Sequence, residues 1–386
     1  MGKTETYIDV AIHALNKKGE ELCGDQADLF KSEDEVFFVM ADGLGSGVKA
    51  NILATLTVKI AMTMLRHGES LEETIDTIMQ TLPVCSVRKV AYSTFCMVHL
   101  KNDGRCRLIE YHNPPVFFCS NGRITPYIST YETYGDKEVR ISELELGIGD
   151  YLTIVSDGAV HAGVGTMLNH GWEWPHIAAF LNRQQPKSAE LISKTLIETC
   201  NNLYGGLPGD DTSVATLMLV EPKVTRLFSG PPVQREQDHE VAARFVQGSV
   251  KRVVCGGTAA NLMARELNRE LRCEMDYYEP SIPPIAHIKG IDLVTEGVLT
   301  LKRVSERLED YAAGQIISFG KPDAATLLLN LLINDSTHIE FWIGKAINPA
   351  HQNPDFPFEL SIKQNILDRI IATLRKIGKI VMIQYV

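Results

Sequence analysis

Aspartates recur where apolar runs of a strand's length end, or in the turns beside those runs. The set comprises Asp25, Asp42, Asp157, Asp210 and Asp211. Strands of one sheet can end at the same edge, so these carboxylates can converge. Clustered carboxylates repel one another and cannot all stay ionised in a partly buried site unless a cation compensates them. Because oxygen ligands favour hard ions, the pattern predicts a site for Mg²⁺ or Mn²⁺.

Two hard ions about 3.5 to 4 Å apart can hold a hydroxide between them and clamp a phosphoryl group for in-line attack. A phosphate ester is therefore the expected substrate class. Glycine follows both Asp42 and Asp157, where it lets the backbone turn sharply and brings a carbonyl close to an ion. A single Asp-Gly pair is more often an ordinary turn. Two such pairs after apolar runs, with Gly-Asp-Asp-Thr before a third run, favour the metal site.

The elements that must position these residues alternate between β-rich runs and amphipathic helices. The pattern predicts strands over 36–40, 94–100, 106–111, 116–119, 150–155 and 212–220, and helices over 48–66, 71–82, 174–182 and 189–203. We expect the strands between residues 94 and 119 to form a consecutive antiparallel meander, since short turns separate them. In the first helix, Leu53, Leu56, Ile60 and Met64 fall at helical spacing and predict the buried face.

The length and composition predict two globular domains without a basic surface. A chain of 386 residues exceeds what one hydrophobic core usually serves. A formal net charge of -10 leaves no basic field for nucleic acid or an anionic membrane. The eight cysteines form no CxxC pair and no dense framework of the secreted kind. The N-terminal stretch is interrupted by charges, so we expect a cytoplasmic protein with neither a nucleic-acid nor a membrane partner.

A change in composition predicts a domain boundary after residue 221. Residues 222–240 contain prolines, a glycine and charged residues, which suit a connector. Residues 241–386 alternate strand-like and helical runs, which predicts a smaller layered α/β domain with a sheet that can be parallel. The predicted strands are 252–255, 291–294, 338–342 and 379–383, and the predicted helices are 259–271, 298–308, 324–332 and 362–377.

Five motifs of the first 220 residues together resemble a known family. They are Cys-Gly-Asp-Gln, Val-Met-Ala-Asp-Gly-Leu-Gly-Ser-Gly, Tyr-His-Asn-Pro-Pro-Val-Phe-Phe, Ile-Val-Ser-Asp-Gly and Gly-Asp-Asp-Thr-Ser-Val. In this order they resemble the metal-dependent type 2C protein phosphatases, and more closely the bacterial branch typified by stage II sporulation protein E. The resemblance spans roughly residues 7–220. It implies an α/β (α+β) fold in which a β-sandwich is flanked by helices.

The resemblance also implies a reaction and its ligands. The reaction is hydrolysis of phosphoserine or phosphothreonine by metal-activated water at two Mg²⁺ or Mn²⁺ ions. Asp42 would bridge both ions while Gly43 offers its carbonyl, and Asp25 would lie on the side of the second ion. Asp157 and Asp210 would bind the first ion, so that Asp42 and Asp157 act catalytically through metal-bound water. The implied partner is a phosphorylated regulator, such as an anti-sigma-factor antagonist, and a dimer remains possible.

The sequence departs from the family pattern at three places. Asp211 stands where the wider family often carries asparagine, which makes it a weaker candidate ligand. The family's phosphate-binding arginine has only Lys17 and Lys18 in a similar place, so the substrate-binding side chain stays open. The acidic residue that often follows Ser-Asp-Gly is absent from 159–161, which leaves a third ion open. His161 is either a proton donor to the leaving group or, as more often, a loop histidine without a role.

Two further patterns are weaker signals. Gly43, Gly45 and Gly47 give GxGxG, whereas a dinucleotide-binding turn needs its third glycine one position later. In the second domain, Cys-Gly-Gly-Thr at 255–258 joins a strand to a helix, and its amides could bind an anion. Capping of the helix by Thr258 is the plainer interpretation. A strand followed by an acidic turn recurs at 291–297, and the two together permit a ligand site.

Three functions remain open at this point. The first is an active phosphoprotein phosphatase with a regulatory or ligand-binding second domain. The second is a catalytically weak or inactive scaffold with a phosphatase fold, although such a protein would be expected to lose its metal-binding aspartates. The third is a small-molecule phosphoesterase, which the residues do not separate from the first.

Overall fold

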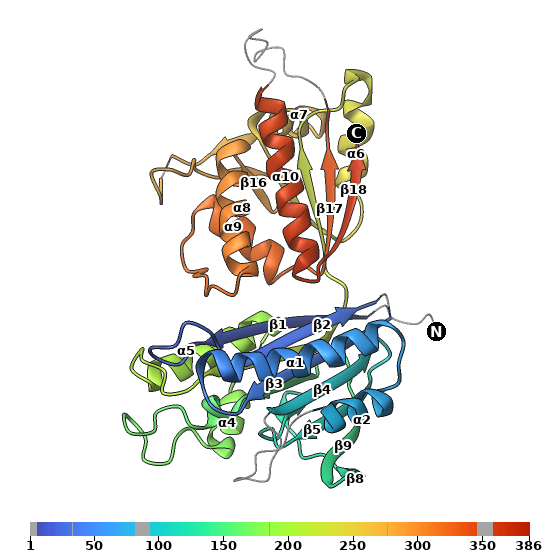
Figure 1. Ribbon diagram of the computed structural model, residues 1–386. Helices are drawn as coiled ribbons and strands as arrows, with labels where there is room; N and C mark the ends of the chain where they lie inside the picture. The colour runs from blue at the N-terminus through green and yellow to red at the C-terminus, as the bar shows by residue number, and fades with distance from the viewer. Residues whose placement is uncertain (1–5, 33, 82–92, 185, 276, 346–357) are drawn as a thin grey trace. The chain divides into compact units, whose positions relative to one another are not determined.

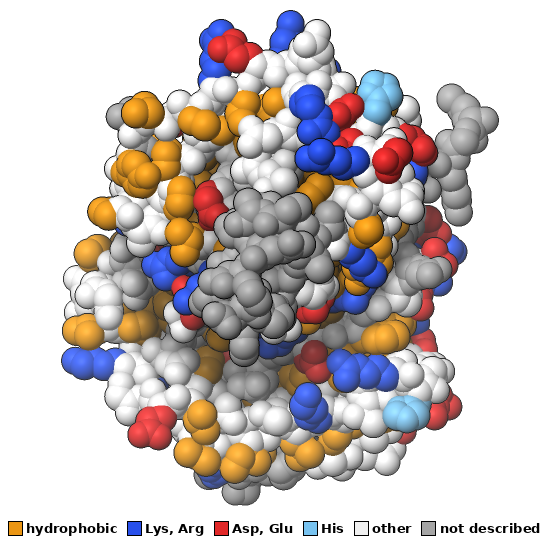
Figure 2. Space-filling model, turned by 90° about the horizontal axis from the view of Figure 1, so that it is seen from above, with side chains coloured by type: hydrophobic (Ala, Val, Ile, Leu, Met, Phe, Trp, Pro, Cys, Tyr) orange, Lys and Arg blue, Asp and Glu red, His pale blue; other side chains and the backbone are white. Residues whose placement is uncertain are grey.

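The computed structural model describes residues 6–32, 34–81, 93–184, 186–275, 277–345 and 358–386. Their contacts divide the chain into two compact units, Met1–Glu221 and Pro222–Val386, each drawn with its own sheets and helices in Figure 1. On the face shown in Figure 2, the Lys and Arg side chains of the described residues are interspersed with Asp and Glu side chains. The two units are described separately below.

The first unit is a β-sandwich of two antiparallel sheets. The six-stranded sheet has the order β2-β3-β4-β5-β9-β8, and the five-stranded sheet has the order β1-β11-β10-β6-β7. The strands are β1 (Tyr7–Leu15), β2 (Asp25–Lys31), β3 (Glu35–Gly43), β4 (Ser93–Lys101), β5 (Arg105–Tyr111), β6 (Phe117–Ser120), β7 (Arg123–Ile124), β8 (Thr130–Tyr134), β9 (Lys137–Glu145), β10 (Tyr151–Val155) and β11 (Thr212–Val220). Their facing sides share one core, in which Phe38 of β3 and Val98 of β4 cluster with Leu152 of β10 and Leu217 of β11.

Helices cover the outer faces of both sheets. They are α1 (Gly47–Arg66), α2 (Leu71–Thr81), α3 (Asp157–Val160), α4 (Trp174–Leu181) and α5 (Ala189–Leu203). The helices α1 and α2 pack on the six-stranded sheet, while α4 and α5 pack on the five-stranded sheet. The predicted sandwich flanked by helices is therefore confirmed for this unit.

The predicted meander is wrong at its third strand. The strands β4 and β5 pair as expected, but β6 lies in the other sheet between β10 and β7. The chain crosses between the sheets at His112, whose φ of 52° is left-handed, and at Pro114 and Pro115, which donate no backbone hydrogen bond to a ladder. A short turn in the sequence therefore does not mean that the next strand continues the same sheet.

The predicted buried face of α1 is also wrong. Leu56 is 40% exposed, whereas Ala50, Ala54 and Ala61 are fully buried against the sheet. Alanines let the helix axis approach β3 closely, and the large side chains of α1 that are buried are Val58, Met62 and Leu65 rather than the predicted ones. The helix is long and apolar enough to cross a membrane, but it packs on the sheet as a core helix does.

The second unit is an α/β domain with a mixed seven-stranded sheet in the order β14-β15-β16-β13-β12-β17-β18, whose last five members run parallel. The strands are β12 (Val224–Ser229), β13 (Lys251–Cys255), β14 (Leu271–Cys273), β15 (Ala286–Ile288), β16 (Leu293–Thr295), β17 (His338–Ile343) and β18 (Ile380–Tyr385). The helices are α6 (Asp238–Phe245), α7 (Gly257–Glu266), α8 (Val298–Ala312), α9 (Ala324–Ile333) and α10 (Phe358–Lys376). The helices α8, α9 and α10 cover one face of the sheet, and α6 and α7 cover the other.

The predicted connector over 222–240 is wrong. The strand β12 lies inside it and is hydrogen-bonded on both sides, to β13 and to β17. Its Leu227 and Phe228 are fully buried. The prolines that suggested a connector stand before and after this strand, where they end the pairing rather than prevent it. The second unit therefore begins at Pro222.

Candidate active site

Asp25 and Asp42 lie opposite each other on neighbouring strands. Asp25 is the first residue of β2 and pairs in register with Asp42, which precedes the last residue of β3. The backbone N–H of Gly43 donates to the carbonyl of Gly24 at 3.2 Å and closes this end of the pair. The antiparallel register therefore places two acidic residues that are distant in sequence at one end of the sheet.

Asp157 and Asp210 reach the same place from the other sheet. Asp157 begins α3 directly after β10, and its side chain interacts with that of Asp42. Asp210 precedes β11, and its negative charge raises the pKa of both Asp42 and Asp157. The sandwich thus brings four of the predicted site residues together at the end where β3, β10 and β11 meet.

Burial and mutual repulsion keep protons on this cluster. Burial, followed by the charges of Asp25, Asp157 and Asp210, raises the pKa of Asp42 to about 9. Burial likewise raises the pKa of Asp25 to about 7, an effect that the neighbouring hydroxyls of Ser156 and Ser213 only partly offset. Without a compensating cation, these carboxylates therefore do not all ionise at neutral pH.

The glycines after the aspartates serve close packing. A Cβ on Gly43 would lie 2.0 Å from the carbonyl oxygen of Ala50 in α1, and a Cβ on Gly158 would lie 2.1 Å from the carbonyl oxygen of Asp211. Only glycine lets these backbones approach so closely. The hydroxyl of Tyr204 donates to the carbonyl of Gly158 at 2.7 Å. The Asp-Gly pairs therefore hold α1 and α3 against the acidic residues.

Asp211 has a structural partner that Asp25 lacks. Its Oδ1 accepts the backbone N–H of Lys17 at 3.0 Å, while the Lys17 ammonium lies 3.4 Å from Asp210. Lys17 therefore stands at the acidic cluster, as its place in the sequence suggested. The backbone N–H of Lys18 instead donates to the carbonyl of Pro208.

The donor chemistry of the cluster fits a hard cation. Asp25 is 3% exposed. The hydroxyls of Ser156 and Ser213 lie near its carboxylate but outside hydrogen-bond geometry, so neither oxygen has a hydrogen-bond partner among the described residues. A buried carboxylate in that state is costly unless a cation binds it. Within the described residues, no three His, Cys, Asp or Glu side chains already stand in the arrangement of a metal site. The residues present thus match the ligand type, and the side chains have to close around an ion.

Sequence reasoning missed several neighbours of the cluster. Ser156 precedes Asp157, and its Oγ accepts the backbone N–H of Ser213 at 2.8 Å, which joins β10 to β11 beside Asp25. The thiol of Cys23 lies close enough to Asp25 and Asp211 that burial and their charges raise its pKa. The serines belong to two of the motifs quoted above, so a closer look at the residues beside the aspartates could have found them.

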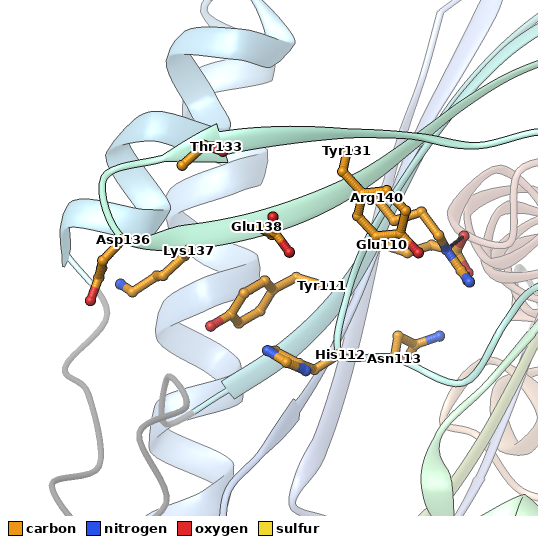
Figure 3. Close-up of a pocket in the computed structure, with 10 residues that line it drawn as sticks. All are labelled: Glu110, Tyr111, His112, Asn113, Tyr131, Thr133, Asp136, Lys137, Glu138 and Arg140. Atoms are coloured by element: carbon orange, nitrogen blue, oxygen red, sulfur yellow. Dashed lines mark hydrogen bonds and ion pairs between the residues drawn. The ribbon is translucent and has the colours of Figure 1, made fainter.

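A cavity of about 610 Å³ lies in the six-stranded sheet and contains none of the predicted site residues. Residues of β5, β8 and β9 surround it, with Glu110 and Arg140 forming an ion pair at one side (Figure 3). The strand register links this cavity to the acidic cluster, since Tyr111 pairs with Phe95, which pairs with Ala41 beside Asp42. The cavity therefore opens two strands away from the candidate site.

Comparisons with known proteins agree with these motifs. Residues 32–219 match the family model described as stage II sporulation protein E (SpoIIE). The first unit therefore belongs to the SpoIIE-like branch of the type 2C phosphatases, as its motifs predicted. The matched range includes Asp42, Asp157, Asp210 and Asp211 and begins after Asp25. No curated protein matches the chain.

Solved structures similar to this chain include two phosphatase-domain structures of the cell fate determinant SpoIIE from Bacillus subtilis. The first, which also holds a fragment of the regulatory domain, is 19% identical with a TM-score of 0.49 and covers 57% of this chain and 65% of that chain. The second is 18% identical with a TM-score of 0.44 and covers 57% of this chain and 95% of that chain. RsbX in complex with magnesium is 20% identical with a TM-score of 0.42 and covers 56% of this chain and all of that chain.

Proposed function

We propose that the first unit hydrolyses phosphoserine or phosphothreonine on a regulatory protein, with its aspartates holding two Mg²⁺ or Mn²⁺ ions. The family match supports a phosphatase function. The observation that carries the metal-dependent reaction is the buried carboxylate of Asp25, unpartnered and opposite Asp42. Asp157 and Asp210 complete the ligand set. When bound, the cations supply the positive charge that these carboxylates lack and a nucleophilic water for the phosphoryl group.

The chain's own residues would orient the substrate. The Lys17 ammonium lies 3.4 Å from Asp210, and it can attract the phosphate of a substrate toward the cluster. The backbone of Lys17 is fixed by Asp211, so Asp211 acts as a positioning residue. His161 lies near enough to Asp157 to lower its pKa, and it is the candidate for protonating the leaving alkoxide.

The cavity beside the cluster supports a protein substrate over a small phosphate ester. It lies at the Asp42 end of the six-stranded sheet, where residues flanking a phosphorylated serine could bind. A small phosphate ester would use only the acidic cluster. A protein substrate should therefore give a much higher kcat/KM than p-nitrophenyl phosphate, because binding energy away from the reacting atoms contributes to the rate.

Hydrolysis of a phosphoserine peptide and of p-nitrophenyl phosphate tests the proposal, with Mn²⁺, Mg²⁺ or EDTA present. We expect metal-dependent activity that Asp42→Ala lowers by about 10³-fold or more, since a residue holding both ions supports every step. Asp76→Ala, a change at an exposed aspartate of α2, is the matched control and should keep full activity. Equal loss in both variants would contradict the assignment.

The alternative function is an inactive scaffold. It is favoured by one observation, namely that no three potential ligands in the described part of the chain are already arranged around a metal position. Calorimetric titration of the folded wild-type chain with Mn²⁺ separates the two functions. A folded chain that neither binds Mn²⁺ nor hydrolyses the phosphoserine peptide would support the scaffold, and Mn²⁺ binding with turnover would reject it.

A further inference from the structure

Four glycines gather at one edge of the parallel sheet in the second unit. We call them the glycine edge: Gly230 after β12, Gly256 after β13, Gly297 after β16 and Gly344 after β17. These strands are parallel neighbours, so their carboxyl ends meet there. The turns touch, since a Cβ on Gly344 would lie 2.1 Å from the carbonyl oxygen of Pro231. In open α/β sheets, ligands bind outside this edge.

The connections diverge at the glycine edge. The strands β12 and β13 lead to α6 and α7 on one face of the sheet, whereas β16 and β17 lead to α8 and α10 on the other (Figure 1). Neighbouring strands whose connections leave in opposite directions open a crevice between them. The pair β12 and β17 forms such a point in the middle of the sheet.

The helix α7 begins at this edge without a cap. Its N-cap residue is Gly256, with φ of 111° and no side chain to accept the first N–H groups. The predicted cap, Thr258, is instead the second residue of the helix. By contrast, Glu296 accepts the N–H of Leu299 at 2.9 Å and so occupies the start of α8. The first turn of α7 therefore presents N–H donors and the positive end of a helix dipole to the crevice.

A lysine without a partner completes the donor set. The ammonium of Lys363, from α10, lies 3.6 Å from where a Cβ on Gly230 would stand and 3.9 Å from the equivalent point on Gly256. It makes no hydrogen bond or ion pair within the described residues. Burial lowers the pKa of this ammonium, against the opposing effect of Cys255 and Glu296. A bound anion would offset that cost.

A buried hydroxyl lies in the first turn of α8, the helix that follows Gly297. Thr300 is fully buried in the first turn of α8, and its Oγ1 has no hydrogen-bond partner among the described residues. It lies on the face of α8 that packs inward, and helical side chains tilt toward the N-terminus, which for α8 follows Gly297. An unpartnered buried hydroxyl is costly, so an acceptor that reaches it would be stabilised.

We propose that the glycine edge binds the phosphate group of a small phosphorylated molecule. The N–H groups at the start of α7, the Lys363 ammonium and the Thr300 hydroxyl are donors on different elements, from α7, α10 and α8. A tetrahedral phosphate accepts from several directions at once, which a planar carboxylate does less well. The glycines leave room for the ligand to approach the backbone. This inference does not depend on the function proposed for the first unit.

Calorimetric titration of the full chain in EDTA tests the inference, because EDTA removes the cations that could hold phosphate in the first unit. The probes are inorganic phosphate, pyrophosphate and adenosine triphosphate, with citrate as the anion control. We expect Lys363→Gln to weaken the binding of the tightest phosphate probe by about tenfold or more. Lys302→Gln makes the same charge change at an exposed position of α8 and should leave the affinity unchanged.

A second variant separates binding from folding. A methyl group on Gly257 would meet no atom within 4 Å, so Gly257→Ala fills the mouth of the crevice without a clash inside the protein. It should weaken phosphate binding by about tenfold while the melting temperature stays the same or rises. Binding that survives both Lys363→Gln and Gly257→Ala, or no binding of any phosphate probe to the wild type, would overturn the inference.

Discussion

The acidic cluster of the first unit and the glycine edge of the second unit both lie at strand ends, and they have opposite electrostatic needs. At the first, the buried carboxylate of Asp25 has no hydrogen-bond donor among the described residues, and burial together with neighbouring charges raises the pKa of Asp25 and Asp42. At the second, Lys363 and Thr300 have no hydrogen-bond acceptor within the part of the chain that the structure describes. One end therefore calls for a cation and the other for an anion. The sign of the charge on the ligand that a site would bind can be inferred from whether its buried groups lack hydrogen-bond donors or acceptors.

Glycine also has different roles in the acidic cluster and at the glycine edge. Substitution of the glycine in the acidic cluster is expected to have the largest effect on stability. Gly43→Ala places a Cβ 2.0 Å from the Ala50 carbonyl oxygen and should lower the free energy of unfolding of the first unit by about 3 kcal/mol or more. Gly257→Ala meets open space at the start of α7 and should leave the second unit unchanged or about 0.5 kcal/mol more stable.

Urea unfolding, monitored by hydrogen exchange in each unit, measures the change in the free energy of unfolding of the two units separately. A Gly43→Ala protein with wild-type stability would show that α1 can shift away from β3 at little cost. Destabilisation by Gly257→Ala would show that a side chain at the start of α7 has less room than the structure indicates.

Burial and repulsion within the acidic cluster together predict a smaller effect on stability with a definite pH dependence. The folded-state pKa of Asp42 is about 9 and that of Asp25 is about 7, both above the ordinary range. The folded state therefore binds more protons, so its stability is fully present below about pH 4 and is lost as the pH rises through these values. In EDTA, Asp42→Asn should raise the free energy of unfolding by at least about 1 kcal/mol at pH 9.

The same substitution should have the opposite effect when metal is present. Mn²⁺ should raise the melting temperature of the wild type at pH 8, because a ligand that binds only the folded state stabilises it, and Asp42→Asn should lose most of this gain. Melting curves in EDTA and in Mn²⁺ from pH 6 to pH 9 provide both measurements. An Asp42→Asn protein less stable than the wild type in EDTA at pH 9 would contradict the electrostatic account.

The sequence was a good guide to the acidic residues because their signal is local. An apolar run that ends in Asp-Gly marks both a strand and the acidic residue near its end. The strand β10 ends at Val155 as predicted, whereas β3 continues past the predicted residue 40 to Gly43. Pairing Asp25 with Asp42 requires the register of β2 with β3. That register depends on contacts across the fold, which spacing along the chain does not contain.

The errors have the same physical origin. In α1, hydrophobicity predicted burial of Leu56 rather than Ala54. The close approach of α1 to β3 instead requires the smaller side chain at the contact. The strand β12 was not predicted because Pro222 and Pro231 flank it, and its last three residues are buried on both faces of the sheet rather than alternating. Lys363 gave no signal in the sequence, since only the packing of α10 brings its ammonium to the glycine edge. Packing between elements that are distant in sequence therefore determines which of these residues are buried and which meet, and local patterns do not contain this information.

Lys17 provides the smallest of the expected effects and the closest comparison with Lys363. Both ammonium groups stand at strand ends, but Lys17 has an acidic neighbour in Asp210 at 3.4 Å and is one-third exposed, so solvent weakens the pair. Lys17→Gln should therefore raise KM for a phosphoserine peptide by about three- to tenfold with a smaller change in kcat, because its charge would attract the phosphate in ground state and transition state alike. Lys18→Gln is the neighbouring control. If Lys17→Gln lowers kcat and leaves KM unchanged, Lys17 acts on the reacting phosphoryl group itself, and the analogy with an anion-binding lysine fails.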